Sequence, residues 1–454
     1  MKAISKTRTA KQRLREDYRM GFEMEQTTGD SSWYTHDRFG MFIHWGLYSL
    51  GARHEWMKGR EFMTNEQYNK YFKRFDPDLY DPELWATLAS DAGMKYFVVT
   101  AKHHEGFCLW DSALTDYKAT NTPAGRDLLT PMIEAFKSKN IRPGLYYSLL
   151  DWHHRHYTLD VKHPLRYNKE FLEDQKHREW QQYVDYMHGQ TRELLTKFGK
   201  IDLMFFDFSI PPEEGFPGKG KEEWQSEKLV ELIRELQPHI LLNDRLQVKG
   251  DITTPEQYQP REWIQMNGKR VVWEACHTFS GSWGYYRDEE TWKSVDTLVK
   301  MLIDMVSKGG NLLLNVGPTG RGEFDERAID RLKGIGEWMK RHSRSIYGCT
   351  AAPEELQCPE DCRFTYNPEN NRLYLHVYSW PFKHIHLRGL TGMVEYAQLL
   401  NDASEIRMKQ GEEEMTMEAG AFNEGRPRDI LTLLLPVKKP NVTVPVIELF
   451  LKSR

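Results

Sequence analysis

A carboxylate that closes a short apolar run is the first residue of this sequence that could do chemistry. Asp207 ends the run Ile-Asp-Leu-Met-Phe-Phe-Asp at 201–207. Such a run is typical of a strand buried on both faces, as in a parallel sheet. Burying a carboxylate is costly without a partner or a purpose, and strand carboxyl ends form the active-site face of (β/α) barrels. Asp207 is therefore the first catalytic candidate, and the alternative is an aspartate that caps the next turn.

Other polar residues follow predicted strands in the same way. They are His44, His103, His104, Tyr146, Asn243, Asp244, Arg245 and Glu274, with the loops 53–56 and 253–256 beside them. In a barrel these strand ends converge on one pocket, whatever their separation in the sequence. The pocket would hold neutral donors, one arginine, two or three carboxylates and tryptophans. This composition suits the recognition of hydroxyl groups combined with acid–base catalysis.

Two carboxylates on either side of one bond are what glycoside hydrolysis requires. One, ionised, attacks or stabilises the oxocarbenium carbon, and the other, protonated, gives a proton to the leaving oxygen. Their environments must push their pKa values apart. An arginine near the first carboxylate favours its ionised form, and Arg245 is the candidate for that role beside Asp207.

A metal site is the main alternative for the histidines. His153, His154 and His156, together with His103 and His104, could indicate a metallohydrolase. However, no His-x-His ends the first strand, and the carboxylates lie late in the chain without ligand spacing. We therefore expect no metal and no cofactor.

The elements that must position these residues alternate between strands and helices. Strands are predicted at 40–46, 95–101, 141–148, 201–207, 239–244, 270–274 and 310–316, and helices at 81–92, 128–139, 168–198, 224–236, 292–307 and 324–342. Near-continuous apolar strands alternating with helices predict a parallel α/β fold. Over about 300 residues this favours a TIM-like (β/α) barrel. Only seven strands are visible, so either residues 45–79 contain an eighth or the barrel is irregular.

The chain ends are organised differently. Residues 1–32 are polar and predict a surface arm with a helical stretch at 9–24. After residue 347 short alternating runs separated by turn residues predict an antiparallel β-sandwich. The expected domains are the arm at 1–32, the catalytic barrel at 33–347 and the sandwich at 348–454.

Composition excludes several classes of partner. The 454 residues include 62 basic and 66 acidic side chains, a net charge of −4, so neither nucleic acid nor an anionic membrane is indicated. The five cysteines show no zinc spacing and resemble reduced thiols, although Cys358 and Cys362 are close enough in sequence to pair. With no signal peptide or membrane span visible, we expect a cytoplasmic protein. The oligomeric state stays open, and a homo-oligomer is compatible with the sequence.

Six motifs in order closely resemble the α-L-fucosidases of glycoside hydrolase family 29. They are Phe-Gly-Met-Phe-Ile-His-Trp-Gly at 39–46, Glu-Trp at 55–56, Ala-Lys-His-His-Glu-Gly-Phe at 101–107, Gly-Leu-Tyr-Tyr-Ser at 144–148, Asn-Asp-Arg at 243–245 and Gly-Gly-Asn-Leu-Leu-Leu-Asn-Val-Gly-Pro at 309–318. The likeness covers about residues 33–348, and a following sandwich fits it. The combination is highly specific, although no single motif is. The aromatic content of 13% also suits sugar binding, because aromatic faces stack on sugar rings.

The resemblance implies an exo-acting, retaining α-L-fucosidase that cleaves terminal fucosyl residues from oligosaccharides or glycoconjugates through a covalent intermediate. Asp207 stands where the family carries its nucleophile. Seven residues match the family's fucose-binding positions: His44, Glu55, Trp56, His103, His104, Tyr146 and Arg245. Phe205 stands where relatives often have tryptophan, a departure that would weaken stacking on the methyl edge of the sugar. The implied partner is a fucosylated glycan.

The resemblance leaves the acid/base open, because that residue lies on a variable loop in the family. Glu256, eleven residues after Arg245, is favoured because a loop residue can approach the leaving group. Glu274 is the rival, predicted to end a strand and otherwise to position substrate. Glu256 could instead open a helix, since Thr-Pro-Glu is a common helix start. A glycosidase acting on a related sugar and a non-catalytic fucose-binding protein are the competing functions.

Overall fold

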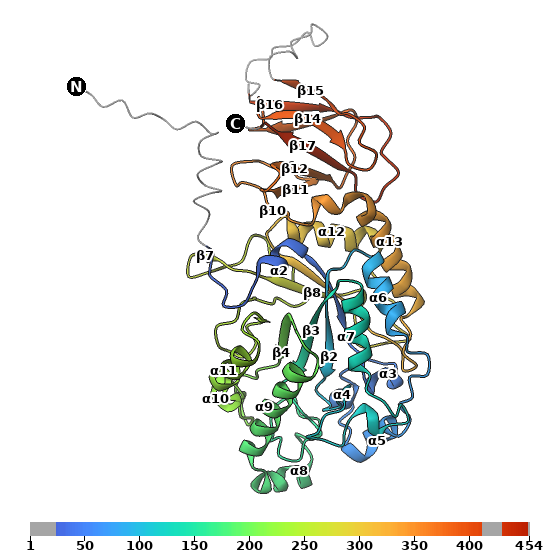
Figure 1. Ribbon diagram of the computed structural model, residues 1–454, viewed down its shortest axis with the longest axis vertical. Coiled ribbons are helices and arrows are strands. Elements are labelled where there is room, and N and C mark those ends of the chain that lie inside the picture. Colours follow the sequence, from blue (N-terminus) through green and yellow to red (C-terminus); the bar gives the residue numbers. More distant parts are fainter. Residues whose placement is uncertain (1–23, 411–428, 453–454) are drawn as a thin grey trace, which may run out of the picture.

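Seven parallel strands form the central sheet of the computed structural model, which describes residues 24–410 and 429–452 (Figure 1). They are β1 (Phe39–Ile43), β2 (Tyr96–Lys102), β3 (Arg142–Ser148), β4 (Leu203–Asp207), β5 (Leu241–Leu242), β8 (Glu274–Thr278) and β9 (Asn311–Val316). Their order is β5-β4-β3-β2-β1-β9-β8. All of these strand residues are buried except one half-buried arginine, which is the burial that their continuous apolar pattern predicts.

An irregular segment, residues 251–257, lies between the edge strands β5 and β8. Ile252 forms a parallel bridge to Asn243, just after β5, and Glu256 forms one to β8. Pro255 has no backbone N–H to donate, so the segment does not form a regular ladder. It nevertheless occupies the eighth position of the barrel. The missing strand is therefore an irregular one, and it carries Glu256 at its end.

No strand lies at 45–79, where the sequence left room for one; this stretch is fully described. It holds three helices instead: α3 (Tyr48–Gly51), α4 (Met57–Arg60) and α5 (Asn65–Phe72). These helices and the loops between them follow β1 at the end of the barrel that faces away from the C-terminal strands (Figure 1). The strand carboxyl ends therefore face away from the sandwich.

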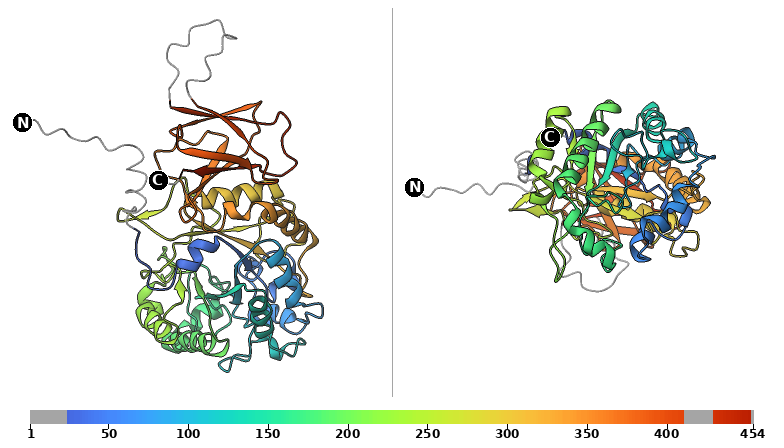
Figure 2. Two further views of the ribbon diagram at one scale, coloured as in Figure 1. Left: turned by 45° about the horizontal axis from the view of Figure 1, so that its top comes forward. Right: turned by 90° about the horizontal axis from the view of Figure 1, so that it is seen from below.

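The longer helices surround the sheet, as the view from below shows (Figure 2). The remaining helices are α2 (Ser32–Asp37), α6 (Pro82–Asp91), α7 (Leu129–Ser138), α8 (Lys169–Asp174), α9 (Trp180–Lys197), α10 (Lys221–Trp224), α11 (Ser226–Leu236), α12 (Val295–Val306) and α13 (Glu326–His342). The Asp81 side chain caps the start of α6, where it accepts a hydrogen bond from Leu84 N. The helix expected at 9–24 lies, up to residue 23, outside the described residues.

Two helix predictions are corrected. The single helix expected at 168–198 is split into α8 and α9, because Arg178 and Glu179 adopt extended backbone angles. Arg178 Nη1 donates instead to the Tyr157 carbonyl at 2.8 Å. The helix expected from residue 224 is likewise divided, with Gln225 in the left-handed conformation between α10 and α11.

The sixth predicted strand, 270–274, is wrong, because the strand of the sheet begins where the prediction ended: β8 spans Glu274–Thr278. Glu274 begins β8 and does not end a strand. The preceding residues Lys269–Arg270 form β7, which pairs with β6 (Gln265–Met266) in a hairpin. Its turn, Asn267-Gly268, has positive φ at both positions, which is the signature of a tight hairpin turn.

Two antiparallel sheets follow the barrel. One contains β10 (Thr350–Ala351), β11 (Cys362–Asn367), β12 (Arg372–Val377), β17 (Val446–Leu451) and β14 (Val394–Leu399), and the other β13 (His384–Arg388), β16 (Ile430–Leu434) and β15 (Arg407–Gln410). Both sheets contribute to one apolar core. They stack on α12 and α13, where Arg363 Nε lies 3.0 Å from Asp304 Oδ1 (Figure 1). The predicted fold class, a TIM-like barrel with a C-terminal sandwich, is confirmed.

The state of the cysteines and the length of the helices can also be read from the structure. All five cysteines are free, so Cys358 and Cys362 do not pair in this structure. Within the described ranges, no helix combines the length and apolarity needed to cross a bilayer.

Candidate active site

Asp207 ends β4 at the mouth of the barrel and is held by two donors. The Tyr146 hydroxyl donates to Asp207 Oδ2 at 2.7 Å, and Arg245 Nη1 donates to Oδ1 at 2.5 Å. Asp207 is only 8% exposed, so its charge depends on these partners. A guanidinium and a hydroxyl donor stabilise a carboxylate strongly where water is scarce. Burial and the Asp207 charge raise the pKa of Tyr146 well above its usual range, so Tyr146 remains a donor.

Phe205 forms the floor beneath these groups. Its ring centroid lies 5.1 Å from the Arg245 guanidinium carbon and 5.9 Å from the Tyr146 ring, which is nearly parallel to it. Phe205 is buried. Phe205 therefore packs against both groups that hold Asp207. A guanidinium over an aromatic face is an attractive arrangement.

Glu256 reaches the same arginine from the irregular segment that closes the barrel. Arg245 Nη1 donates to Glu256 Oε2 at 2.9 Å, as well as to Asp207. Asp207 Oδ1 and Glu256 Oε2 therefore lie no more than about 5.4 Å apart, because both accept from the same nitrogen. This limit on the nearest oxygens is compatible with the roughly 5–5.5 Å between the two carboxyl groups of retaining glycosidases. Glu256 lies in no helix, so the alternative of a helix start does not hold.

The two carboxylates differ in their surroundings. Glu256 has a side chain that is 43% exposed, whereas that of Asp207 is 12% exposed. Partial burial raises the pKa of Glu256, Arg245 lowers it in part, and the charge of Asp207 raises it again. The net increase favours the protonated form of Glu256. Asp207 is thus anchored by two donors, whereas Glu256 is more accessible and has a raised pKa, as an acid catalyst requires.

His44 presents a neutral ring to the pocket. Asn315 Nδ2 donates to the Trp283 carbonyl at 2.6 Å, so Asn315 Oδ1 accepts from His44 Nδ1, also at 2.6 Å. This assigns the proton to Nδ1 and leaves Nε2 as an acceptor. Burial lowers the pKa of His44 well below its usual range, and His103 adds to the effect. A neutral acceptor of this kind suits a sugar hydroxyl.

His103 and His104 lie together, with ring centroids 4.0 Å apart. The backbone turns after β2, where Gly106 N donates to the His103 carbonyl, so the rings do not diverge as they would in an extended strand. His103 lies 5.7 Å from Tyr146 and nearly parallel to it. The Trp56 ring is 4.7 Å from that of His104. The two histidines therefore line one wall, with Trp56 at its edge.

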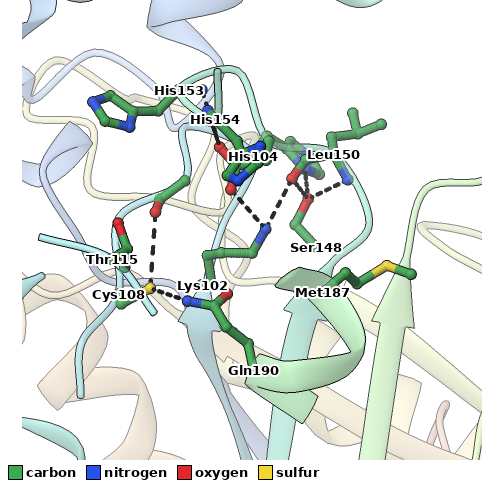
Figure 3. Close-up of polar contacts among 12 residues, drawn as sticks. Lys102, His104, Cys108, Thr115, Ser148, Leu150, His153, His154, Met187 and Gln190 are labelled. Carbon is green, nitrogen blue, oxygen red and sulfur yellow. Dashed lines mark hydrogen bonds and ion pairs between the residues drawn. The ribbon is translucent and has the colours of Figure 1, made fainter. Parts of the chain in front are cut away.

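A buried polar network behind this wall holds His104 in place (Figure 3). His104 Nδ1 is 2.6 Å from Ser148 Oγ, and the backbone N–H of Trp152 donates to the His104 carbonyl at 2.8 Å. Lys102 Nζ lies 3.1 Å from Asp151 Oδ2, and both side chains are almost completely buried. A buried ion pair needs good geometry to offset desolvation. This pair joins the end of β2 to Asp151, the residue before Trp152, and so holds the loop that contacts His104.

Glu55 forms hydrogen bonds to a loop of the protein next to His44. Its Oε2 accepts hydrogen bonds from Gly284 N at 2.8 Å and from Ser282 Oγ at 3.3 Å. These residues flank Trp283, whose ring lies 5.1 Å from that of His44. Glu55 therefore positions the loop that places Trp283 in the pocket.

Glu274 lies at the opposite end of the barrel from Asp207. It begins β8, is fully buried, and accepts a hydrogen bond from Tyr96 at the start of β2. The expectation that Glu274 reaches the pocket from a strand end is wrong, because the strand starts where the sequence predicted its end. Burial raises the pKa of Glu274 to about 7.

This environment predicts a pH-dependent stability that Glu274→Gln should remove. The folded protein retains a proton on Glu274 that the unfolded chain loses near pH 4.5. The resulting stabilisation is fully present below pH 4.5 and is lost as the pH rises to 7, a change of about 3 kcal/mol. Urea unfolding between pH 4.5 and 7.5 should show the wild type losing this amount relative to the variant. Parallel curves for the two proteins would contradict the prediction.

His153 and His154, two of the candidates for a metal site, pack against tyrosines. His153 stacks on Tyr117 at 3.8 Å, and the ring of His154 lies 4.4 Å from that of Tyr186. In residues 24–410 and 429–452, no three or more His, Cys, Asp or Glu side chains are grouped to hold a metal ion.

The structure thus brings most of the predicted residues together and adds others. The residues that contact one another in a single cluster at the carboxyl ends of the strands are His44, His103, His104, Tyr146, Asp207, Arg245 and Glu256, with Phe205 packed against Arg245 and Trp56 against His104. Asn315 and Trp283 were missed. Asn315 is polar at the end of a predicted strand, a signal that would have found it. Trp283 lies in an irregular loop whose sequence carries no periodicity.

Comparison with known proteins shows the family to which this chain is related. The sequence profile of the family described as "Alpha-L-fucosidase" matches residues 5–344. The plasma alpha-L-fucosidase of Rattus norvegicus is 30% identical over 383 residues, which cover 77% of this chain and 78% of that protein. The alpha-L-fucosidase of Dictyostelium discoideum is 28% identical over 384 residues, covering 77% and 78%.

Solved structures agree with this result. Alpha-L-fucosidase isoenzyme 1 from Paenibacillus thiaminolyticus superposes with a TM-score of 0.85 at 43% identity, covering 93% of this chain and 99% of that one. A GH29 alpha-L-fucosidase from Bacteroides thetaiotaomicron superposes with a TM-score of 0.80 at 25% identity, covering 94% and 98%. That structure is a trapped covalent intermediate formed with 2-fluoro-fucosyl fluoride in a glutamate-to-glutamine mutant.

Proposed function

This chain belongs to the family of α-L-fucosidases, and we propose that Asp207 is its nucleophile and Glu256 its acid/base. The enzyme is a glycoside hydrolase that retains anomeric configuration through double displacement. The observation that carries the residue assignment is the shared arginine, which holds both carboxylates within reach of one bond. Carboxyl groups this close are compatible with attack by the carboxylate itself, as in retaining glycosidases.

In the first step Asp207 attacks the anomeric carbon while Glu256 donates its proton to the glycosidic oxygen. The bond between that carbon and oxygen breaks, the aglycone leaves as an alcohol, and a fucosyl ester forms on Asp207. In the second step Glu256, now ionised, takes a proton from water. The water oxygen attacks the anomeric carbon and releases Asp207. Two inversions give net retention.

Neutral acceptors and apolar faces complete the proposed fucose site. His44 Nδ1 donates to Asn315 Oδ1. Ser148 Oγ donates to the Leu150 carbonyl at 2.9 Å, so it accepts from His104 Nδ1. Both rings therefore keep Nε2 as an acceptor for a sugar hydroxyl. Trp283, beside His44, offers an apolar face for the methyl group of fucose. The C6 methyl distinguishes fucose from galactose, and contacts of this size contribute only about 1–3 kcal/mol of discrimination.

The stereochemical outcome tests this function directly. We expect hydrolysis of an aryl α-L-fucoside, followed by proton NMR, to show α-L-fucose first, with the β anomer appearing only through mutarotation. Initial release of β-L-fucose would exclude the covalent route, and no hydrolysis would exclude the activity. A homo-oligomer and a cytoplasmic location stay predictions from the sequence.

A further inference from the structure

Three aromatic side chains gather on the surface at the active-site end of the barrel. They are Phe62, Tyr167 and Phe216, and together they form what we call the aromatic platform. Phe62 is 47% exposed and Tyr167 is 67% exposed. The Tyr167 ring lies 6.0 Å from that of Phe62 and 6.2 Å from that of Phe216. Contiguous exposed apolar surface of this kind marks binding sites more often than scattered single residues do.

The platform is built from three loops that surround the pocket. Phe62 follows α4, which begins directly after Trp56, and Tyr167 precedes α8 in the loop after β3. Figure 1 places α4 and α8 at the end of the barrel away from the sandwich. Phe216 belongs to the loop that begins immediately after Asp207. The platform therefore lies on the same face of the barrel as the catalytic carboxylates.

Arg166 orders two of the three rings. Its guanidinium carbon lies 4.6 Å from the centroid of Phe62 and 5.0 Å from that of Tyr167. Arg166 Nη1 donates to the His163 carbonyl at 3.0 Å, which anchors the side chain. Aromatic faces bounded by guanidinium N–H donors suit a sugar ring, because the C–H face stacks while hydroxyl groups accept hydrogen bonds.

A buried ion pair fixes the loops that carry the platform. Lys219 and Ile210 exchange two backbone hydrogen bonds of 2.8 Å, so residues 210–219 form a small hairpin with Phe216 near its tip. Lys219 Nζ then contacts Asp160 Oδ2 of the loop after β3 at 2.8 Å. Both side chains are almost completely buried, and Tyr157 also donates to Asp160. Buried charges need such partners, and the pair holds the two loops in one arrangement.

We propose that the aromatic platform binds the sugar unit to which the fucose is attached. This inference rests on the proposed function, because an exo-acting pocket encloses the terminal fucose and only the aglycone extends outward. A surface on the same face of the barrel lies on the side toward which the aglycone extends. The platform suits a neutral pyranose, because its exposed rings can stack on the sugar and the Arg166 guanidinium can donate to the sugar hydroxyl groups.

The test compares substrates with and without an aglycone sugar. α-L-Fucosyl fluoride has no ring in its leaving group, and fucosylated lactose, in its α1,2- and α1,3-linked forms, has a pyranose there. Tyr167→Ala and Phe62→Ala should each lower kcat/KM for the preferred trisaccharide by about three- to tenfold and leave that for the fluoride unchanged. Tyr167→Phe should keep the wild-type values, since stacking needs the ring. Phe382→Ala, which removes a ring that is 72% exposed on the sandwich, is the matched control and should change neither substrate.

Other outcomes are equally decisive. Equal losses on both substrates, or no loss on the trisaccharide, would overturn the platform assignment. A wild type that cleaves the fluoride but neither trisaccharide would overturn the platform alone, whereas inactivity on every substrate would remove the proposed function and the platform with it. If sedimentation shows that Tyr167→Ala dissociates an oligomer, the rings are covered by a second copy and do not bind sugar.

Discussion

The Asp207→Ala variant is expected to lose turnover of aryl α-L-fucosides by about four orders of magnitude or more, the scale on which covalent enzymes depend on their nucleophile. Arg245 and Tyr146 would remain in the site, since both also pack against Phe205. However, no carboxylate would be left to form the ester. Azide fits the vacated space and attacks from the same face. The product should therefore be β-fucosyl azide, formed with a single inversion.

The control for this variant is Asp202→Asn. Asp202 precedes β4 at its other end, where its carboxylate contacts Arg142 Nη1 at 3.3 Å and Lys200. Removing that charge leaves the pocket untouched, so activity should stay near the wild-type value. Thermal unfolding of both variants separates loss of chemistry from loss of fold. Full activity of Asp207→Ala, or an α-fucosyl azide from it, would contradict the assignment.

The second large effect concerns the proton donor. Glu256→Ala should lower the rate by about 10²–10⁴-fold on a substrate with a poor leaving group and far less on one with a good leaving group, because a good leaving group needs no proton. Azide should rescue the variant with retention, giving α-fucosyl azide. The wild-type kcat/KM should fall as the pH rises through the pKa of Glu256, which burial raises, and the Glu256→Gln variant should lose that alkaline limb.

Glu274→Gln provides the matched comparison. Glu274 lies at the opposite end of the barrel, bonded to Tyr96, so its replacement should affect good and poor leaving groups alike. Any loss of activity in this variant should match a loss of folding stability and should not depend on the acidity of the leaving group. A Glu274 variant that behaves as described for Glu256, with azide rescue, would overturn the acid/base assignment.

The chemistry at regular strand ends was predictable from the sequence. Asp207, Tyr146 and His44 each follow or end a continuous apolar run, and parallel strands bring such positions to one face. Arg245 and His103 follow the same rule. The periodicity of the apolar runs is local information, and it predicts both the fold class and the common face of these residues.

The irregular parts were decided by the tertiary structure. Residues 251–257 close the barrel through bridges to Asn243 and Cys276, and the proline among them leaves no strand pattern to detect. Glu274 could be assigned to either end of a strand, because an apolar run does not reveal where its hydrogen-bonded partners begin. Trp283 lies beside His44 because Glu55 and Asn315 both hold the backbone around it. Contacts between segments so distant in the chain depend on three-dimensional packing, which local patterns of residue type do not encode.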